Sequence, residues 1–188
     1  MKRANVLIMQ AGGSTPVLNR SLYGVAREAL GRQDVGEVYG SRRGLEGLLS
    51  GEVTDLRGRA KSWWDRAART PGAILGSSRH RLSDEDLPAV LSSLDRFRVA
   101  CLLIIGGNDS AETALRIASE TSAAGRPVAV VHVPKTIDND LASTDHSPGY
   151  GSAARFVALA TMGAGRDAET MGEESPVTVI EVMGRDAG

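Results

Sequence analysis

The chain alternates short apolar runs with longer segments of helical spacing, and this alternation restricts its fold more than any other feature. The apolar runs are rich in β-branched residues and predict buried strands at residues 6–9, 73–75, 99–105, 128–133 and 177–182. Apolar residues recur at helical intervals at residues 17–30, 84–97, 111–124 and 152–162. Strands that alternate with helices lie parallel and are joined by right-handed crossovers. We therefore predict an α/β fold, a three-layer α/β/α domain with a mostly parallel, Rossmann-like sheet.

Residues 35–69 depart from this regular alternation. Six glycines interrupt the segment, and Trp63-Trp64 opens an amphipathic stretch near its end. Glycine weakens the interior of helices and strands, so each element here must be short. We predict the order strand, helix, short strand, helix.

Size and charge restrict the class of protein. With 188 residues, the chain is long enough for one hydrophobic core and too short for two full domains. Its formal net charge is -1, and 41% of its residues are hydrophobic, values that indicate no nucleic-acid or membrane partner. The single cysteine, Cys101, has no intramolecular partner for a disulfide, which fits a reducing compartment.

The apolar N-terminal segment is interpreted as a strand rather than as a signal peptide. Asn5 and Gln10 interrupt it, and Gly12-Gly13 ends it abruptly. No other stretch approaches the roughly 20 apolar residues that span a bilayer. We expect the protein to be cytoplasmic.

The first candidate site is the Gly12-Gly13 loop, which follows the first predicted strand and precedes a helix. In open α/β sheets, ligands bind outside the carboxyl ends of the strands. Glycines let backbone N–H groups approach an anion, and the start of a helix adds a favourable dipole. A plain tight turn explains the same pair of glycines, so this loop alone decides nothing.

The second candidate site is the sequence Gly106-Gly107-Asn108-Asp109-Ser110, which follows the predicted strand at residues 99–105. It offers the same backbone cradle, together with a carboxylate and an amide. An acidic group beside bound phosphates normally requires a divalent cation between them, which predicts Asn108 and Asp109 as metal ligands. The alternative is that the aspartate caps the helix.

The third candidate site is the sequence PKTIDND at residues 134–140, directly after the strand at residues 128–133. Two carboxylates, a hydroxyl, an amide and an amine occur together at the end of one strand. A carboxylate with a neighbouring lysine is a common general base. A solvated polar turn is the alternative, but such turns rarely require a lysine and two aspartates.

Taken in order, these loops resemble the phosphofructokinase family, whose pattern is a double-glycine loop followed by GGDGS, PGTIDND and MGR. The fourth part is present here as Met183-Gly184-Arg185, and Gly76-Ser77-Ser78-Arg79 is a further match. The resemblance covers almost the whole chain, and the combination of motifs is highly specific.

The resemblance implies an enzyme of glycolysis that uses Mg²⁺ and transfers a phosphoryl group to the 1-hydroxyl of fructose 6-phosphate, giving fructose 1,6-bisphosphate. It assigns Asp138 as the base that accepts the hydroxyl proton, with Asp140 assisting and Thr136 contacting the transferred group. Lys135 and Arg185 complete the implied catalytic set. The implied donor-phosphate residues are Gly12, Gly13, Arg79, Gly107, Asp109 and Ser110, and the implied sugar-phosphate residues are Thr136, Ile137, Asp138, Met183, Gly184 and Arg185.

Two departures from the family pattern favour pyrophosphate over ATP as the donor. Asp109 stands where ATP-using relatives have glycine, so its side chain fills space that the α-phosphate of a nucleotide needs and repels its charge. Lys135 replaces the glycine of PGTIDND and can neutralise the departing phosphate. The resemblance agrees, because pyrophosphate-using members carry lysine at this position.

Two further departures leave other functions open. Asn108 stands where the family has a magnesium-binding aspartate, and Pro176 stands where many relatives have an arginine. The alternatives are an ATP-dependent 6-phosphofructokinase and a non-catalytic or regulatory phosphate-binding module. A nicotinamide-binding domain is disfavoured because no G-x-G-x-x-G follows the first strand.

The resemblance also implies how the chain is organised. Residues 1–188 would form one phosphate-donor domain, and the greater length of family members suggests truncation at the C-terminal end. The implied partners are fructose 6-phosphate and pyrophosphate or ATP, and the implied assembly of the full-length parent is a homo-oligomer.

Overall fold

The computed structural model describes residues 3–174 and 176–182, which form two compact units. The first unit is Met1–Lys135 and the second is Thr136–Gly188. The first unit holds the sheet and its flanking helices, and the second begins with the polar loop that follows the last strand.

The first unit is built around a five-stranded sheet. Its strand order is β3-β2-β1-β4-β5, and every neighbouring pair is parallel except β2 and β3, which are antiparallel. From β1 the chain continues to β2 on one side of the sheet, and from β4 it continues to β5 on the other side. The strand order therefore reverses between β1 and β4, and ligands of such sheets bind at the carboxyl ends of these two strands. The strands are β1 (Ala4–Gln10), β2 (Val35–Ser41), β3 (Val53–Asp55), β4 (Val99–Gly106) and β5 (Ala129–Pro134).

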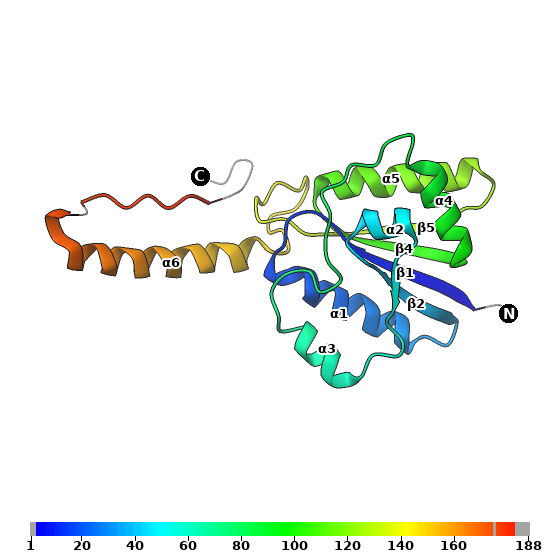
Figure 1. The fold of residues 1–188 in the computed structure, drawn as a ribbon, viewed down its shortest axis with the longest axis horizontal. Coiled ribbons are helices and arrows are strands. Elements are labelled where there is room, and N and C mark those ends of the chain that lie inside the picture. The colour runs from blue at the N-terminus through cyan, green and yellow to red at the C-terminus, as the bar shows by residue number, and fades with distance from the viewer. Residues whose placement is uncertain (1–2, 175, 183–188) are drawn as a thin grey trace. The chain divides into compact units, whose positions relative to one another are not determined.

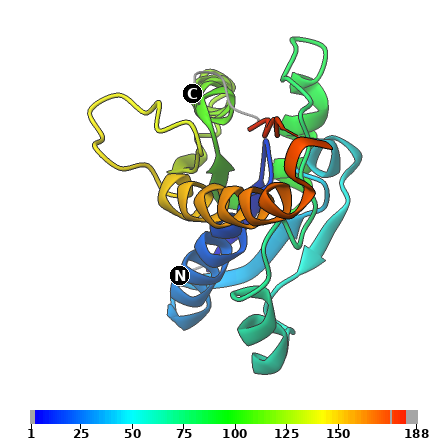
Figure 2. The ribbon, with the colours of Figure 1, turned by 90° about the vertical axis from the view of Figure 1, so that its left-hand side faces the viewer.

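Helices cover both faces of this sheet, which confirms the predicted three-layer α/β/α architecture (Figures 1 and 2). One face carries α1 (Pro16–Gly31) and α3 (Lys61–Ala67). The other carries α2 (Leu45–Ser50), α4 (Leu87–Arg96) and α5 (Asn108–Ala123). The predicted order of strand, helix, short strand and helix over residues 35–69 is also confirmed.

The strand β1 shows why the central strands are apolar along their whole length. Val6 and Ile8 pack in the cluster on the α1 side, whereas Leu7 and Met9 pack in the cluster on the α4 and α5 side. Successive side chains of a strand point to opposite faces, so a strand covered by helices on both faces must be apolar at every position.

The strand predicted at residues 73–75 is wrong. These residues have no strand partner, although Leu75 is buried. Side-chain amides satisfy the backbone instead, because the N–H of Ile74 donates to Asn19 Oδ1 at 2.7 Å and the N–H of Leu75 donates to Gln10 Oε1 at 3.0 Å. An apolar run thus stays buried without joining the sheet.

The second unit contains a loop, the long helix α6 (Tyr150–Met171) and the short 3₁₀ helix η1 (Gly172–Glu174). The loop is closed by a bridge between Thr136 and Gly149. The helix extends beyond the predicted residues 152–162, and it ends where Gly172 adopts a positive φ of 55°.

The strand predicted at residues 177–182 is also wrong. These residues have no regular secondary structure, and Val177 and Val179 are exposed. A strand exists only where a neighbouring strand takes up its backbone hydrogen bonds, so an apolar β-branched run does not suffice. Among the described residues, no helix is long and apolar enough to cross a membrane.

Truncation of a core residue of β1 tests the two-sided burial of the sheet. Leu7 is 0% exposed, so we expect Leu7→Ala to lower the free energy of unfolding by about 2–5 kcal/mol. Leu115 is 71% exposed on α5, so Leu115→Ala should change the free energy of unfolding by less than about 0.5 kcal/mol. Urea denaturation followed by circular dichroism measures both values, and equal losses would contradict this packing.

Candidate phosphate-binding site

The parallel strands bring two of the three candidate loops to one edge of the sheet. β1 ends at Gln10 and β4 ends at Gly106, and the two strands pair in parallel along their length. The pairing extends past the end of β1, where the N–H of Ala11 donates to the carbonyl of Ile105 at 2.9 Å. The Gly12-Gly13 loop and the start of α5 therefore follow adjacent strand ends.

The Gly12-Gly13 loop is tied to a segment far away in the sequence. The N–H of Gly12 donates to the carbonyl of Ser78 at 3.1 Å, and the hydroxyl of Ser77 donates to the carbonyl of Gly12 at 2.6 Å. Gly12 has a φ of 75°, which a residue with a Cβ adopts only with strain. These bonds hold residues 76–79, the further match to the family pattern, against the glycine loop.

Two cations flank the glycine loop. The ammonium of Lys135, a side chain only 5% exposed, donates to the carbonyl of Gly13 at 2.7 Å. A Cβ placed on Gly12 would lie 3.6 Å from Lys135 Nζ, and one placed on Gly13 would lie 3.8 Å from Arg79 Nη2. Backbone without side chains between an ammonium and a guanidinium is a suitable environment for an anion.

The second loop forms the start of α5. The N-cap is Gly107, and no side chain makes a capping hydrogen bond. The alternative interpretation of Asp109 as a helix cap is therefore wrong. Asp109 lies in the first turn instead, where its Oδ2 is 3.5 Å from Nη2 of Arg81. Helix starts attract anions through their N–H groups and dipole.

Close packing fixes the second loop in place. A Cβ on Gly106 would overlap the side chain of the buried Ser110. The carbonyl of Gly106 accepts a hydrogen bond from the N–H of Lys135 at 2.9 Å and contacts Nε2 of His132 at 3.0 Å. The backbone at the end of β4 thus also positions Lys135.

Residues 136–140 of the third loop belong to the second unit, and Thr136 organises them. Its hydroxyl donates to Oδ1 of Asp140 at 2.9 Å and accepts a hydrogen bond from the N–H of Asp138 at 3.0 Å. Asn139, which adopts a positive φ of 53°, accepts from the N–H of Ser147 at 2.8 Å. Ile137 is half-buried in the same loop.

The carboxylate of Asp138 is the candidate base in this loop. Its Oδ1 is buried and has no hydrogen-bond partner among the residues that the structure describes. A buried carboxylate oxygen without a donor is costly, so such an atom is a candidate for binding a ligand proton or a cation. The predicted residues Met183, Gly184 and Arg185 lie outside the described residues.

The metal ligands predicted from the sequence are Asn108 and Asp109, which lie on the first turn of α5. In the described part of the chain, no group of three or more His, Cys, Asp or Glu side chains is arranged to hold a metal ion. Mg²⁺ is commonly bound through one or two protein oxygens together with waters and substrate phosphates. This donor set therefore fits an ion that arrives with its phosphate ligand.

Two residues of the first unit were not assigned a role from the sequence. Gln10 and Asn19 are 0% and 1% exposed, and their side chains bond to each other and to the segment that precedes residues 76–79. The available signal was the uncharged amide of Gln10 in the apolar N-terminal segment, since a buried amide needs partners for both its oxygen and its nitrogen.

Two side chains of the first unit have shifted pKa values. The N–H of Ser83 and the ring of His80, 2.9 Å away, hold the pKa of Asp86 below its usual value. The stability that Asp86 contributes is therefore present above the ordinary carboxyl pKa and is lost as pH falls through the lowered value. Burial raises the pKa of the Cys101 thiol, which makes this thiol less reactive at neutral pH.

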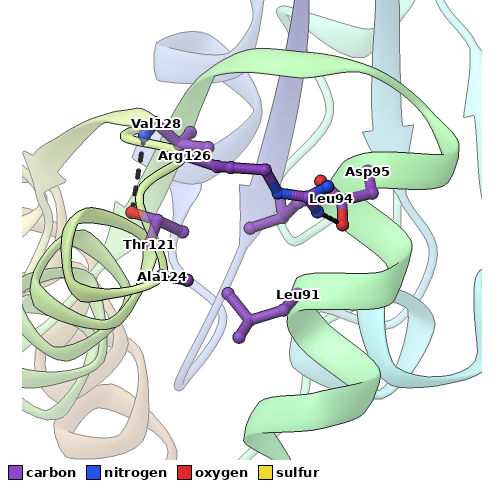
Figure 3. Close-up of a pocket in the computed structure, with 7 residues that line it drawn as sticks. All are labelled: Leu91, Leu94, Asp95, Thr121, Ala124, Arg126 and Val128. Carbon is purple, nitrogen blue, oxygen red and sulfur yellow. Dashed lines mark hydrogen bonds and ion pairs between the residues drawn. The ribbon is translucent and has the colours of Figure 1, made fainter.

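A small pocket lies away from these loops, between α4, the end of α5 and the connection to β5 (Figure 3). Arg126 forms an ion pair with Asp95 across it, and the N–H of Val128 donates to the hydroxyl of Thr121 at 3.4 Å (Figure 3). These residues precede β4 and β5, so the pocket lies at the amino ends of the strands and is separate from the candidate site.

Comparison with known proteins gives a consistent result. Residues 5–188 match the family model described as phosphofructokinase. The chain is 40% identical, over 197 residues, to a pyrophosphate–fructose 6-phosphate 1-phosphotransferase from Xanthomonas campestris, and it is 35% identical to an ATP-dependent 6-phosphofructokinase 3 from Bacteroides thetaiotaomicron. The alignments cover 100% and 96% of this chain but 46% and 52% of those proteins.

A solved structure supports the same relationship. The pyrophosphate-dependent phosphofructokinase from Nitrosospira multiformis superposes with a TM-score of 0.83 at 31% identity. The match covers 90% of this chain and 43% of that protein. This chain thus spans about half the length of the relatives that it matches.

Substitution of one glycine tests the packing of the second loop. We expect Gly106→Ala to lower the free energy of unfolding by about 1–3 kcal/mol, because the added Cβ overlaps Ser110. Gly31→Ala is the matched control: no atom lies within 4 Å of its added Cβ, so stability should stay equal or rise by up to about 1 kcal/mol. Urea denaturation measures the free energy of unfolding of both variants. If Gly106→Ala leaves this free energy unchanged, the loop packs differently from this structure.

Proposed function

The chain belongs to the phosphofructokinase family, and from this membership we propose that it is the phosphate-donor domain of a pyrophosphate-dependent phosphofructokinase. The proposed reaction moves a phosphoryl group from pyrophosphate to the 1-hydroxyl of fructose 6-phosphate and yields fructose 1,6-bisphosphate. We assign residues 1–188 to this domain. The proposed setting is glycolysis in the cytoplasm, in an oligomer of identical chains.

The observation that carries the proposal is the buried ammonium of Lys135 beside the Gly12-Gly13 loop. Its Nζ is 2.7 Å from the carbonyl of Gly13, so the ammonium lies next to backbone that carries no side chains. Pyrophosphate is a compact anion, and a departing phosphate gains further negative charge during transfer. An ammonium held at that point stabilises the transition state more than the ground state.

Asp109 supports pyrophosphate rather than ATP as the donor. It lies in the first turn of α5, where a phosphate bound at the helix start would approach its carboxylate. Two like charges about 4 Å apart repel by about 4 kcal/mol near a protein surface. Arg81, 3.5 Å away, reduces this repulsion without removing the bulk of the side chain. An α-phosphate of ATP would occupy that space, whereas pyrophosphate has no third phosphate.

The remaining roles rest on the contacts of the third loop and on the resemblance to the family. We propose that Asp138 accepts the proton of the 1-hydroxyl through its buried Oδ1. The hydroxyl of Thr136 supports this role, because it bonds both Asp140 and the backbone of Asp138 and thereby fixes the loop. Arg79 would contact the donor phosphates, and Ile137, Met183, Gly184 and Arg185 would contact the sugar phosphate.

We also propose that Mg²⁺ accompanies the donor. Asn108 and Asp109 would hold it through an amide and a carboxylate oxygen at the start of α5. When bound, the ion neutralises charge on the phosphates. The protein's own contribution is to supply the oxygen ligands and the glycine cradle next to them.

Binding measurements test the donor. We expect calorimetry on this chain in Mg²⁺ buffer to show tighter binding of pyrophosphate than of ATP. Lys135→Met, which keeps the side-chain length and removes the charge, should weaken pyrophosphate binding by about 10- to 100-fold. Lys61→Met is the matched control because Lys61 is exposed on α3, and it should leave binding unchanged. Tighter binding of ATP would favour the ATP-dependent alternative.

Turnover tests whether the site is catalytic. A chimera in which this chain replaces the matching part of the Xanthomonas campestris relative should phosphorylate fructose 6-phosphate from pyrophosphate. We expect Lys135→Gly in the chimera to abolish most of this activity, and Asp109→Gly with Lys135→Gly to gain measurable use of ATP, because space and charge at the helix start both change. A chimera that binds pyrophosphate but transfers nothing would indicate a non-catalytic phosphate-binding module.

A further inference from the structure

Two buried side-chain amides join the first strand, the first helix and an irregular segment of the chain. Gln10 is the last residue of β1 and Asn19 lies in the first turns of α1. Gln10 Nε2 donates to Asn19 Oδ1 at 3.1 Å. We infer that this pair positions Arg79 beside the Gly12-Gly13 loop, so that Gln10 and Asn19 act on the donor site without touching the donor.

The amide pair holds the irregular segment at three points. Asn19 Nδ2 donates to the carbonyl of Thr70 at 2.8 Å, and Asn19 Oδ1 accepts from the N–H of Ile74 at 2.7 Å. Gln10 Oε1 accepts from the N–H of Leu75 at 3.0 Å. Both amides therefore use their oxygen and their nitrogen, as burial requires.

The held segment leads directly into the residues that border the glycine loop. After Leu75, Gly76 turns the chain with a φ of 79°, and Ser77 and Ser78 bond the backbone of Gly12 from both directions. Arg79 follows at once, with its guanidinium near Gly13. The amide pair thus belongs to β1 and α1 in the core, and its last contact with the segment, at Leu75, lies four residues before Arg79.

No regular structure replaces these bonds. In the described part of the chain this segment has no strand partner, so without the amides the N–H groups of Ile74 and Leu75 would lose these acceptors. A carboxylate in place of either amide could accept hydrogen bonds but not donate, and an aliphatic side chain could do neither. The amides of Asn19 and Gln10 each donate and accept at these positions.

The predicted effect on pyrophosphate binding rests on the proposed function, whereas the predicted effect on the position of residues 73–80 does not. The experiment therefore has one arm without ligand and one arm with pyrophosphate. It uses this chain with Gln10→Met, which keeps the volume of the side chain, and Asn19→Ala. Asn5→Ala is the matched control, because Asn5 also bridges backbone groups from β1, bonding Phe97 at 2.9 Å and Glu37 at 3.0 Å, but near the amino end of that strand.

The first arm is hydrogen–deuterium exchange of the backbone without ligand. We expect Gln10→Met and Asn19→Ala each to speed exchange across residues 73–80 by at least about tenfold relative to the parent chain, while β4 exchanges as before. Asn5→Ala should leave residues 73–80 unchanged. Equal exchange of this segment in all variants would overturn the inference, as would a uniform rise over the whole first unit.

The second arm is a double-mutant cycle with Arg79→Ala, read as the dissociation constant of pyrophosphate by calorimetry. Because the amides act through Arg79, Asn19→Ala should weaken binding about tenfold in the parent chain and less than about twofold in the Arg79→Ala background. A merely stabilising role predicts the same factor in both backgrounds, which would overturn the inference. If the parent chain binds no pyrophosphate, the proposed function fails. The hydrogen–deuterium exchange arm then still tests whether Gln10 and Asn19 hold residues 73–80 in place.

Discussion

The parallel pairing of β1 with β4 is the contact on which the site of the first unit depends. The ladder runs from Asn5 opposite Val99 to Gln10 opposite Ile105, so both strands end at the same edge. The glycine loop follows β1 and the start of α5 follows β4, so both lie at this edge of the sheet. The register shifts once, between Asn5 and Val6, and is regular from Val6 to Gln10, where helices on both faces bury the strands.

Charge at that edge is arranged by groups that are themselves held by the backbone. Lys135 is buried, and its N–H bonds the end of β4 while its ammonium bonds the first loop, so one residue joins two strand ends. Arg79 approaches from a segment without regular structure, which depends on side-chain amides for its position. The ammonium of Lys135 is held by its hydrogen bond to Gly13, and the segment that leads into Arg79 is held by the side-chain amides. Such a site is suited to a small polyanion, since less conformational entropy is lost when the ligand binds.

Much of this arrangement could be predicted from the sequence, and the errors have a common cause. The strand at residues 99–105 and the helix at residues 17–30 were correct because their apolar period is long and their ends carry glycine or proline. Residues 73–75 and 177–182 have the composition of strands but no strand partner, and partnership is not encoded in local composition. The helix cap at Asp109 was a local alternative that the geometry of Gly107 excluded.

The sequence by itself determined the class of fold, most of its helices and strands and the family, because periodicity and short motifs are local features that can be recognised without knowledge of tertiary contacts. Only the tertiary structure decided that Lys135 reaches Gly13, 122 residues away in the chain, and that Gln10 and Asn19 hold the segment before Arg79. The physical reason is that a hydrogen bond between distant residues depends on distance and direction in space, and these are set by the packing of the whole core rather than by any neighbouring residue.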